Sequence, residues 1–309
     1  MTDSHQTLVR WASQMPQARV LDSPFLCAVL AMPYAIAGQI ELANSLVMHA
    51  VERLKPNEDF LFAMCMVQKA FLAACRARFA DMRKFAESAL EYLPQEEYYL
   101  RGMMFQVLAS SYSSTEPLRS RALLHEALQM QEPFGNRNLT CSALGNLAMC
   151  CANLGLYDES QMHTSSALGL YSEAEGACKP MLAYAWLAQA IVAHQLGRFD
   201  QAERDLDAYR RLTDLQGGAS EMVAQACVLR AKARVCRGDM PGAEAAFTRA
   251  LNASVAGAAQ AFPGAVLVKP CAAVVKGRVD ACLSARDEHR GALRALAAVA
   301  AYCLGDAAP

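Results

Sequence analysis

The sequence predicts an all-α fold, a right-handed superhelical solenoid of about six to seven stacked helix pairs. The first observation behind this prediction is a recurring pattern: a small residue, another small residue five positions later, and an alanine seven positions after that. Successive copies are 39, 38, 40, 42 and 41 residues apart. Repeats of this length contain two helices that bury their apolar faces against neighbouring repeats. The copies are anchored at Gly38, Gly155, Gly197 and Gly238, with weaker copies anchored at Ala77 and Thr115.

A second regularity lies seven residues before each anchor, where a small side chain would let the two helices of a repeat approach closely. The third repeat departs from it, because Leu108 holds this position and Ala109 stands beside it. The turn of the third repeat is therefore expected to differ by one residue. The other repeats have Ala31, Ala70, Ala148, Ala190 and Ala231 at this position.

The first repeat shows how each element is expected to form. Ser23 offers a capping side chain and Pro24 suits the first helical position, so a helix is predicted over 25–37. Gly38 permits the turn, and a second helix is predicted over 40–54. The later repeats are expected to follow the same order of helix, turn at the anchor, and helix.

The repeat signal weakens towards the carboxy terminus. We expect one repeat domain over residues 1–253 and a degenerate repeat or capping helices, partly irregular, over 254–309. Residues 255–273 are alanine-rich with interspersed glycine and proline, which predicts a loop or poorly formed helices. Gly277 begins a further segment that resembles the earlier turns.

Composition narrows the classes of function. The formal net charge is −1 and no block of Lys or Arg stands out, so direct nucleic-acid binding is not expected. No apolar run approaches the roughly 20 residues of a membrane span, and the start lacks a signal-peptide pattern, so we expect a cytoplasmic protein without membrane contact. The twelve cysteines form no C-x-x-C pair, which favours reduced, buried thiols over a zinc site. No cofactor is expected.

Several segments resemble a known family. They are Thr7–Pro16 with its Leu-Val-Arg-Trp, the turn at Ser23-Pro24, and Gly38–Ala43. Together with Asn146-Leu-Ala and Gly155-Leu-Tyr, they are similar to the tetratricopeptide-like sensor region of the ATP-dependent LuxR-type transcription activators typified by MalT. The resemblance covers roughly residues 5 to 253. It implies a domain that senses an effector within a transcription regulator.

The chain departs from that family in two respects. It contains no G-x-x-x-x-G-K-[ST] phosphate-binding loop, and no basic helix-turn-helix segment follows residue 253. ATP hydrolysis and DNA binding are therefore not carried over. We expect either the sensor region of a larger regulator or a stand-alone relative.

The first helix of each pair is expected to line the concave surface of the solenoid, and its register selects candidate ligand-binding residues. The fourth repeat is the clearest case, because its amide side chains recur every three to four residues on one face. Amides suit a sugar, a polar metabolite or a peptide backbone. A solvated stripe, or amides bonded to nearby carbonyls, is the alternative. The candidates are Gln68, Phe71, Gln106, Ser142, Asn146, Met149, Asn153, Tyr184, His194, Gln225 and Lys232.

Other singled-out residues favour packing over chemistry. Trp186 matches a packing position of the repeat, and His125 and His163 are expected on the surface of second helices. No nucleophile, base and carboxylate arrangement is apparent, and a lone His194 is weak evidence for catalysis. An enzyme is therefore not expected.

Two functions remain open. The first is a sensor that binds a small-molecule effector or a regulatory protein in its groove and so shifts the state of a transcription regulator. The second is a tetratricopeptide-type scaffold or chaperone that holds a peptide segment of a partner. Self-association into a homo-oligomer is left open.

Overall fold

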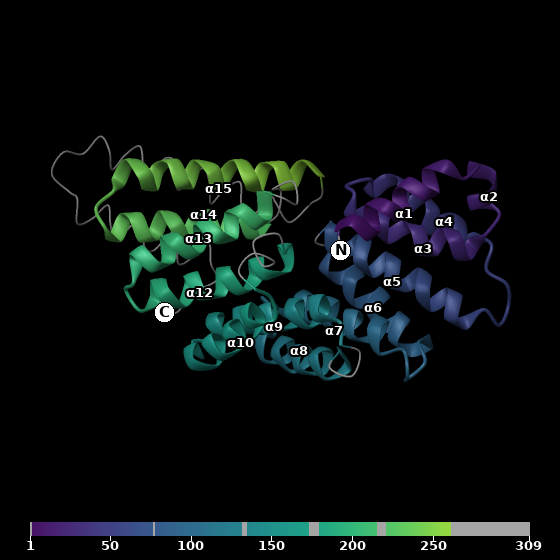
Figure 1. Ribbon diagram of the computed structural model, residues 1–309, viewed down its shortest axis with the longest axis horizontal. Coiled ribbons are helices and arrows are strands. Elements are labelled where there is room, and N and C mark those ends of the chain that lie inside the picture. Colours follow the sequence, from purple (N-terminus) through teal and green to yellow (C-terminus); the bar gives the residue numbers. More distant parts are fainter. Residues whose placement is uncertain (1, 77, 132–134, 173–178, 215–220, 261–309) are drawn as a thin grey trace. The chain divides into compact units, whose positions relative to one another are not determined.

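The computed structural model describes residues 2–76, 78–131, 135–172, 179–214 and 221–260, and these residues form helices joined by turns (Figure 1). By contacts the chain divides into two compact units, Met1–Leu139 and Thr140–Pro309. Within the described residues, none of the helices is both long and apolar enough to cross a bilayer.

The amino-terminal unit begins with two helices that precede the repeats and continues with three helix pairs. The two helices of each pair contact each other. The pairs are α3 with α4, α5 with α6, and α7 with α8. Its helices are α1 (Thr2–Gln14), α2 (Gln17–Leu21), α3 (Pro24–Ile36), α4 (Ile40–Glu52), α5 (Asp59–Cys75), α6 (Phe79–Tyr92), α7 (Tyr98–Tyr112) and α8 (Pro117–Gln131).

The carboxy-terminal unit holds the remaining three pairs. Helices α12, α13, α14 and α15 follow one another as neighbouring layers in Figure 1, and each contacts the next. Its elements are α9 (Arg137–Asn153), α10 (Tyr157–Gly169), the 3₁₀ turn η2 (Pro180–Leu182), α12 (Ala183–Gln195), α13 (Phe199–Asp214), α14 (Glu221–Cys236) and α15 (Met240–Gln260).

The glycine anchors end the first helices as the pattern predicts. Gly38 has a φ of +81°, the left-handed region that a side chain disfavours. The N–H of Gly38 donates to the Ala35 carbonyl and the N–H of Gln39 to the Tyr34 carbonyl, which together form a Schellman cap. Gly155, Gly197 and Gly238 have φ values of +76°, +72° and +78°. In each of these turns the N–H of the residue after the glycine donates to the carbonyl five residues earlier, at 2.8–2.9 Å.

The start of the first repeat is also as expected. Ser23 is the N-cap of α3, its Oγ accepts from the Leu26 N–H at 3.3 Å, and Pro24 is the first helical residue. The third repeat confirms the expected difference of one residue. Four residues separate α7 from α8, where the other pairs have three.

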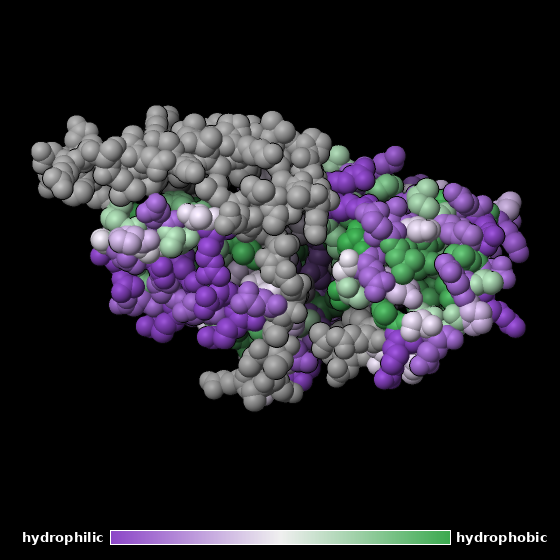
Figure 2. Space-filling view, turned by 90° about the horizontal axis from the view of Figure 1, so that it is seen from above, coloured by the Kyte–Doolittle hydropathy of each residue, from purple (hydrophilic) through white to green (hydrophobic). Residues whose placement is uncertain are grey.

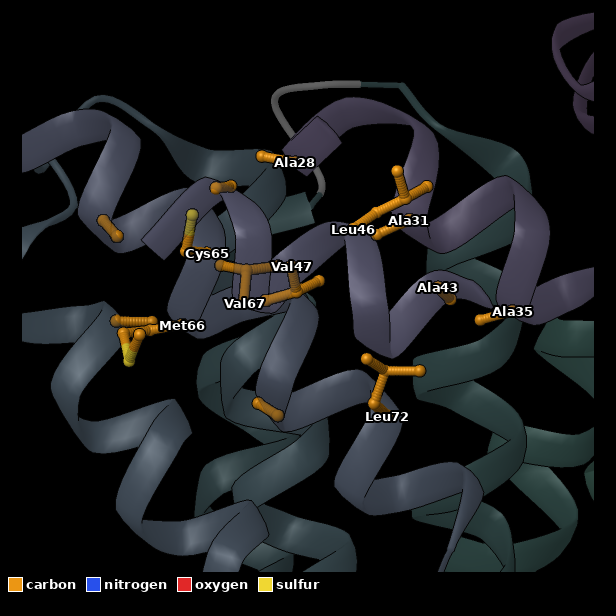
Figure 3. Packing of buried hydrophobic residues seen from close by; sticks show 14 of the residues in the cluster. Ala28, Ala31, Ala35, Ala43, Leu46, Val47, Cys65, Met66, Val67 and Leu72 are labelled. Atoms are coloured by element: carbon orange, nitrogen blue, oxygen red, sulfur yellow. The ribbon is translucent and has the colours of Figure 1, made fainter. Parts of the chain in front are cut away.

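The small residue seven positions before each anchor and the small residue five positions after it meet where the two helices of a repeat contact each other. In the fourth repeat the Ser160 hydroxyl of α10 donates to the Ala148 carbonyl of α9 at 2.8 Å. In the first repeat Ala31 and Ala43 are both buried, and Figure 3 shows them with Leu46 and Val47 among the buried side chains that α3, α4 and α5 contribute. Small side chains here let the two helix backbones approach, which explains why this pattern recurs.

Two sequence expectations differ from the structure. Helix α15 continues to Gln260 and so crosses the expected domain boundary at residue 253, because its alanines favour a helix despite Gly257. The rest of the expected irregular segment and the copy at Gly277 lie outside the described residues. Cys75 and Cys236 are exposed and Cys227 is partly exposed, whereas buried thiols were expected. The two exposed cysteines are the last residues of α5 and α14.

Candidate binding surface

The candidate residues of the amino-terminal unit do not form an open surface. Gln68 on α5 is buried at 6% exposure, and its Oε1 has no hydrogen-bond partner within the described part of the chain. Phe71 packs against the hydrophobic core of this unit. Gln106 on α7 is partly exposed. Gln68 is removed from solvent and Phe71 is partly buried because α5 contacts α3, α4, α6 and α7.

The candidates of the carboxy-terminal unit are accessible. Asn153 is exposed, and the other seven are partly exposed. They lie on three first helices, of which α12 contacts α14 and approaches α9. We call this set the first-helix face: Ser142, Asn146, Met149 and Asn153 on α9, Tyr184 and His194 on α12, and Gln225 and Lys232 on α14.

A glycine brings α9 and α12 together at this face. A Cβ on Gly145 would lie 3.0 Å from the Tyr184 Cβ and 3.3 Å from the Ala185 backbone nitrogen. Real Cβ contacts are rarely so short, so a side chain at Gly145 would push the helices apart. The glycine therefore sets the separation between the amides of α9 and the phenol-bearing Tyr184 of α12.

The amide of Asn146 bonds within its own helix. Its Nδ2 donates to the Ser142 carbonyl at 2.9 Å. An amide bonded to a nearby carbonyl is the alternative to a ligand-binding role that the sequence leaves open. It uses one of the two N–H donors, and the side chain stays partly exposed.

His194 and Lys232 form the electrostatic part of the face. Burial, and to a smaller extent the charge of Lys232, lowers the pKa of His194 below its usual 6.5. The His194 ring packs edge-on against Phe199, with centroids 5.6 Å apart. Its imidazole is therefore neutral near pH 7, and Lys232 supplies a cation beside it.

The sequence did not single out an ion-pair cluster that links α13 to α14. Arg230 bonds to Glu203 at 3.1 Å and to Asp207 at 2.8 Å, and Arg234 bonds to Glu203 at 2.8 Å. Arg234 also donates to the Gly242 carbonyl at 3.2 Å. The spacing of four residues within each pair, acidic on α13 and basic on α14, was the available signal. The cluster links α13 to α14 in the neighbouring repeat. Its basic and acidic groups are paired with one another, so little of their charge is available to a ligand.

The remaining sequence expectations have mixed outcomes. His163 was expected on the surface but is buried at 7% exposure, because it faces α9 rather than solvent. Trp186 and His125 are partly exposed. Most large apolar side chains that are exposed among the described residues belong to the amino-terminal unit, with Trp11, Phe25 and Leu118 all above half exposed. In Figure 2 this unit shows apolar patches, and the visible surface of the other unit is largely hydrophilic.

Burial governs the thiols of the core. It raises the pKa of Cys65 to about 11 and that of Cys141 to about 12. Both cysteines are therefore protonated at neutral pH and are poor nucleophiles.

Comparison with known proteins identifies helical-repeat proteins with a similar fold. The tetratricopeptide repeat model matches residues 139–215, less than half of the chain. The apo form of RapI is 13% identical with a TM-score of 0.55, over 74% of this chain and 97% of that one. A Rap protein complexed with Competence and Sporulation Factor is 14% identical with a TM-score of 0.62, over 82% and 71%. None of the curated proteins matches the chain significantly by sequence.

A third similar structure is a signal transduction ATPase with numerous domains and a tetratricopeptide repeat sensor, from Pyrococcus horikoshii. It is 14% identical with a TM-score of 0.55, over 94% of this chain and 44% of that one. All three likenesses fall below 25% identity and show the fold alone. With the helix pairs and the repeat match, they confirm the predicted all-α solenoid of tetratricopeptide-like units.

Proposed function

We propose that the chain is a partner-binding domain whose first-helix face holds an extended peptide segment of another protein, without catalysis. The observation that carries this proposal is the face itself. Three neighbouring first helices present amides, a phenol, an imidazole and an ammonium group, all at least partly accessible. An extended peptide leaves its main-chain N–H and C=O groups unpaired, and amide side chains can pair with both.

The charges of the face favour an acidic segment. Lys232 is the cation, and the eight residues of the face include no carboxylate. A carboxylate placed near His194 would also raise the pKa of this histidine and recruit a proton to it. Acidic peptides should therefore bind more tightly as the pH falls from 8 towards 6, and more weakly as salt increases.

The fold likeness is consistent with this proposal. One of the similar structures is a Rap protein complexed with Competence and Sporulation Factor. That complex concerns the Rap protein, and it supports for this chain only that a solenoid of this fold can serve as a binding domain.

The test uses a displayed library of random peptides selected on the full chain, with affinities then measured by fluorescence anisotropy. Asn146→Ala removes a face amide and should weaken the selected peptides about 3- to 10-fold, as expected for one net hydrogen bond. Lys232→Glu should weaken acidic peptides more, and that loss should shrink at high salt. Gln106→Ala is the matched control, because Gln106 and Asn146 each stand nine residues before their repeat anchors. Equal losses for Asn146→Ala and Gln106→Ala would contradict the assigned surface.

A second candidate is the sensor function implied by the MalT-type resemblance, in which a small-molecule effector occupies the same face within a transcription regulator. The likeness to a signal transduction ATPase with a tetratricopeptide repeat sensor favours it, although this chain spans less than half of that protein. A thermal-shift screen of sugars and polar metabolites separates the two candidates. A compound that raises the melting temperature, with the shift lost in Asn146→Ala and Asn153→Ala, would support the effector sensor over the peptide scaffold.

A further inference from the structure

Three side chains of metal-binding type meet inside the fourth helix pair. The side chain of Cys151 extends from α9, and those of Glu159 and His163 extend from α10. One potential ligand atom of each, the Sγ, a carboxylate oxygen and a ring nitrogen, lies within 4.8 Å of the other two. Cys151 and His163 are buried, and Glu159 is partly exposed.

Local structure explains why these residues converge. Glu159 and His163 are four residues apart, so they lie on the same face of α10, one turn from each other. The cap at Gly155 reverses the chain so that the last turn of α9 faces this part of α10. The bond from the Ser160 hydroxyl to the Ala148 carbonyl holds the two helices together beside the cluster.

The cluster departs from the repeat pattern. His163 stands eight residues after its anchor. The fifth repeat also has a buried polar residue there, Asp205, and the first, second, third and sixth repeats have Leu46, Phe85, Leu123 and Ala246. These four side chains are apolar. A buried imidazole therefore replaces an apolar side chain at a core position, next to a thiol and a carboxylate. The Cys151 thiol donates a hydrogen bond to the Glu159 carboxylate, and coordination to a metal ion is another way to satisfy such buried groups.

We propose that Cys151, Glu159 and His163 bind a Zn²⁺ ion that joins α9 to α10. Thiolate, imidazole and carboxylate are the protein ligands of zinc, and three of them leave a fourth position for water. The ligand atoms of a tetrahedral zinc ion lie roughly 3.3–3.8 Å from one another. The Cys151 Sγ already lies 3.9 Å from a Glu159 oxygen, so small side-chain movements complete the site.

Two properties follow from the position of the site. Glu159 is partly exposed and gives the ion a route from solvent, while the other two ligands are shielded. The ion would tie the two helices of the repeat that carries the amides of the first-helix face. Zinc displaces protons from the thiol and the imidazole, so the affinity should fall as the pH is lowered.

The test is a Co²⁺ titration of the reduced, chelator-treated full chain, followed by absorption. Thiolate-to-Co²⁺ charge transfer should appear and saturate near one ion per chain, and Zn²⁺ should abolish it. Zn²⁺ should also raise the melting temperature. Cys151→Ala should remove the charge-transfer band, and His163→Leu should lower the affinity roughly 100-fold or more. His163→Leu installs the residue that two other repeats carry here, so it should fold.

Matched controls decide the outcome. Cys150 is the adjacent buried cysteine on α9, and Cys150→Ala should leave the Co²⁺ spectrum and affinity unchanged. The proposal fails if Co²⁺ gives no charge-transfer band. It also fails if the band persists in Cys151→Ala, or if Cys150→Ala and His163→Leu weaken binding equally. These results are independent of peptide binding, so either proposal can fail alone.

Discussion

Asp205 provides the sharpest test of the stability of the carboxy-terminal unit. It lies on α13, is only 5% exposed, and its Oδ2 has no hydrogen-bond partner among the described residues. It stands eight residues after its repeat anchor, the position where the first and third repeats have Leu46 and Leu123. Burial raises the pKa of Asp205 from 3.8 to about 6, and Arg204 opposes this rise to a smaller extent.

The shift converts into a pH-dependent free energy of unfolding. Between pH 3.8 and about 6 the native carboxyl keeps its proton while the unfolded one loses it, so stability falls as the pH rises through this range. About two pKa units at 1.36 kcal/mol each give a loss of about 3 kcal/mol, which is complete above pH 6. Asp205→Asn removes the ionisable group at nearly constant volume. It should therefore stabilise the protein by up to about 3 kcal/mol at pH 7.5 and by much less at pH 4.

The assay is urea unfolding followed by circular dichroism, at pH 4 and pH 7.5, for the wild type and Asp205→Asn. Asp207→Asn is the control on the same helix, since Asp207 is partly exposed and paired with Arg230 at 2.8 Å. It should leave stability unchanged or lower it slightly. A gain for Asp205→Asn that is absent at pH 7.5, or equal at both pH values, would refute the assignment of an unpaired buried carboxylate.

Two further predictions concern the fifth repeat. Gly197→Ala should destabilise by roughly 1 kcal/mol in urea unfolding, because the φ of +72° disfavours a side chain although no atom lies within 4 Å of the new Cβ. Gly169→Ala, at a helix end without positive φ, should be neutral or slightly stabilising. The pKa of His194 is lowered, so the unfolded chain takes up this proton first and stability should decline as the pH falls through 6.5. His194→Gln should reduce that decline in pH-dependent melting, and an unchanged decline would show that His194 is not shielded from solvent.

Local signals were sufficient for the helix pairs. Ser23, Pro24 and the glycine anchors act on the backbone within a few residues, so their effects can be predicted without knowledge of the fold. The extra residue in the third turn was predictable for the same reason, because a shifted small residue alters the repeat locally. The end of α15 was not predictable, since an alanine-rich segment with glycine lies close to the balance between helix and coil.

The candidate surface was only partly predictable. Repeat register places Gln68 and Asn146 at equivalent positions, nine residues before their anchors, yet Gln68 is buried and Asn146 is partly exposed. Which neighbours cover a position depends on how the helices of each unit pack, and the register of one helix does not contain that information.

The sequence by itself determined the period of about forty residues, the turns, and the small residues at the helix contacts, because each depends on one or two helical turns of chain. Only the tertiary structure decided which polar residues meet. It confined the first-helix face to α9, α12 and α14, and it paired Arg230 with Glu203 across repeats. It also turned His163 inward towards Cys151, a contact between residues on two helices that no spacing rule for zinc ligands would select. Packing between helices, which depends on the shape of the whole unit, made these choices.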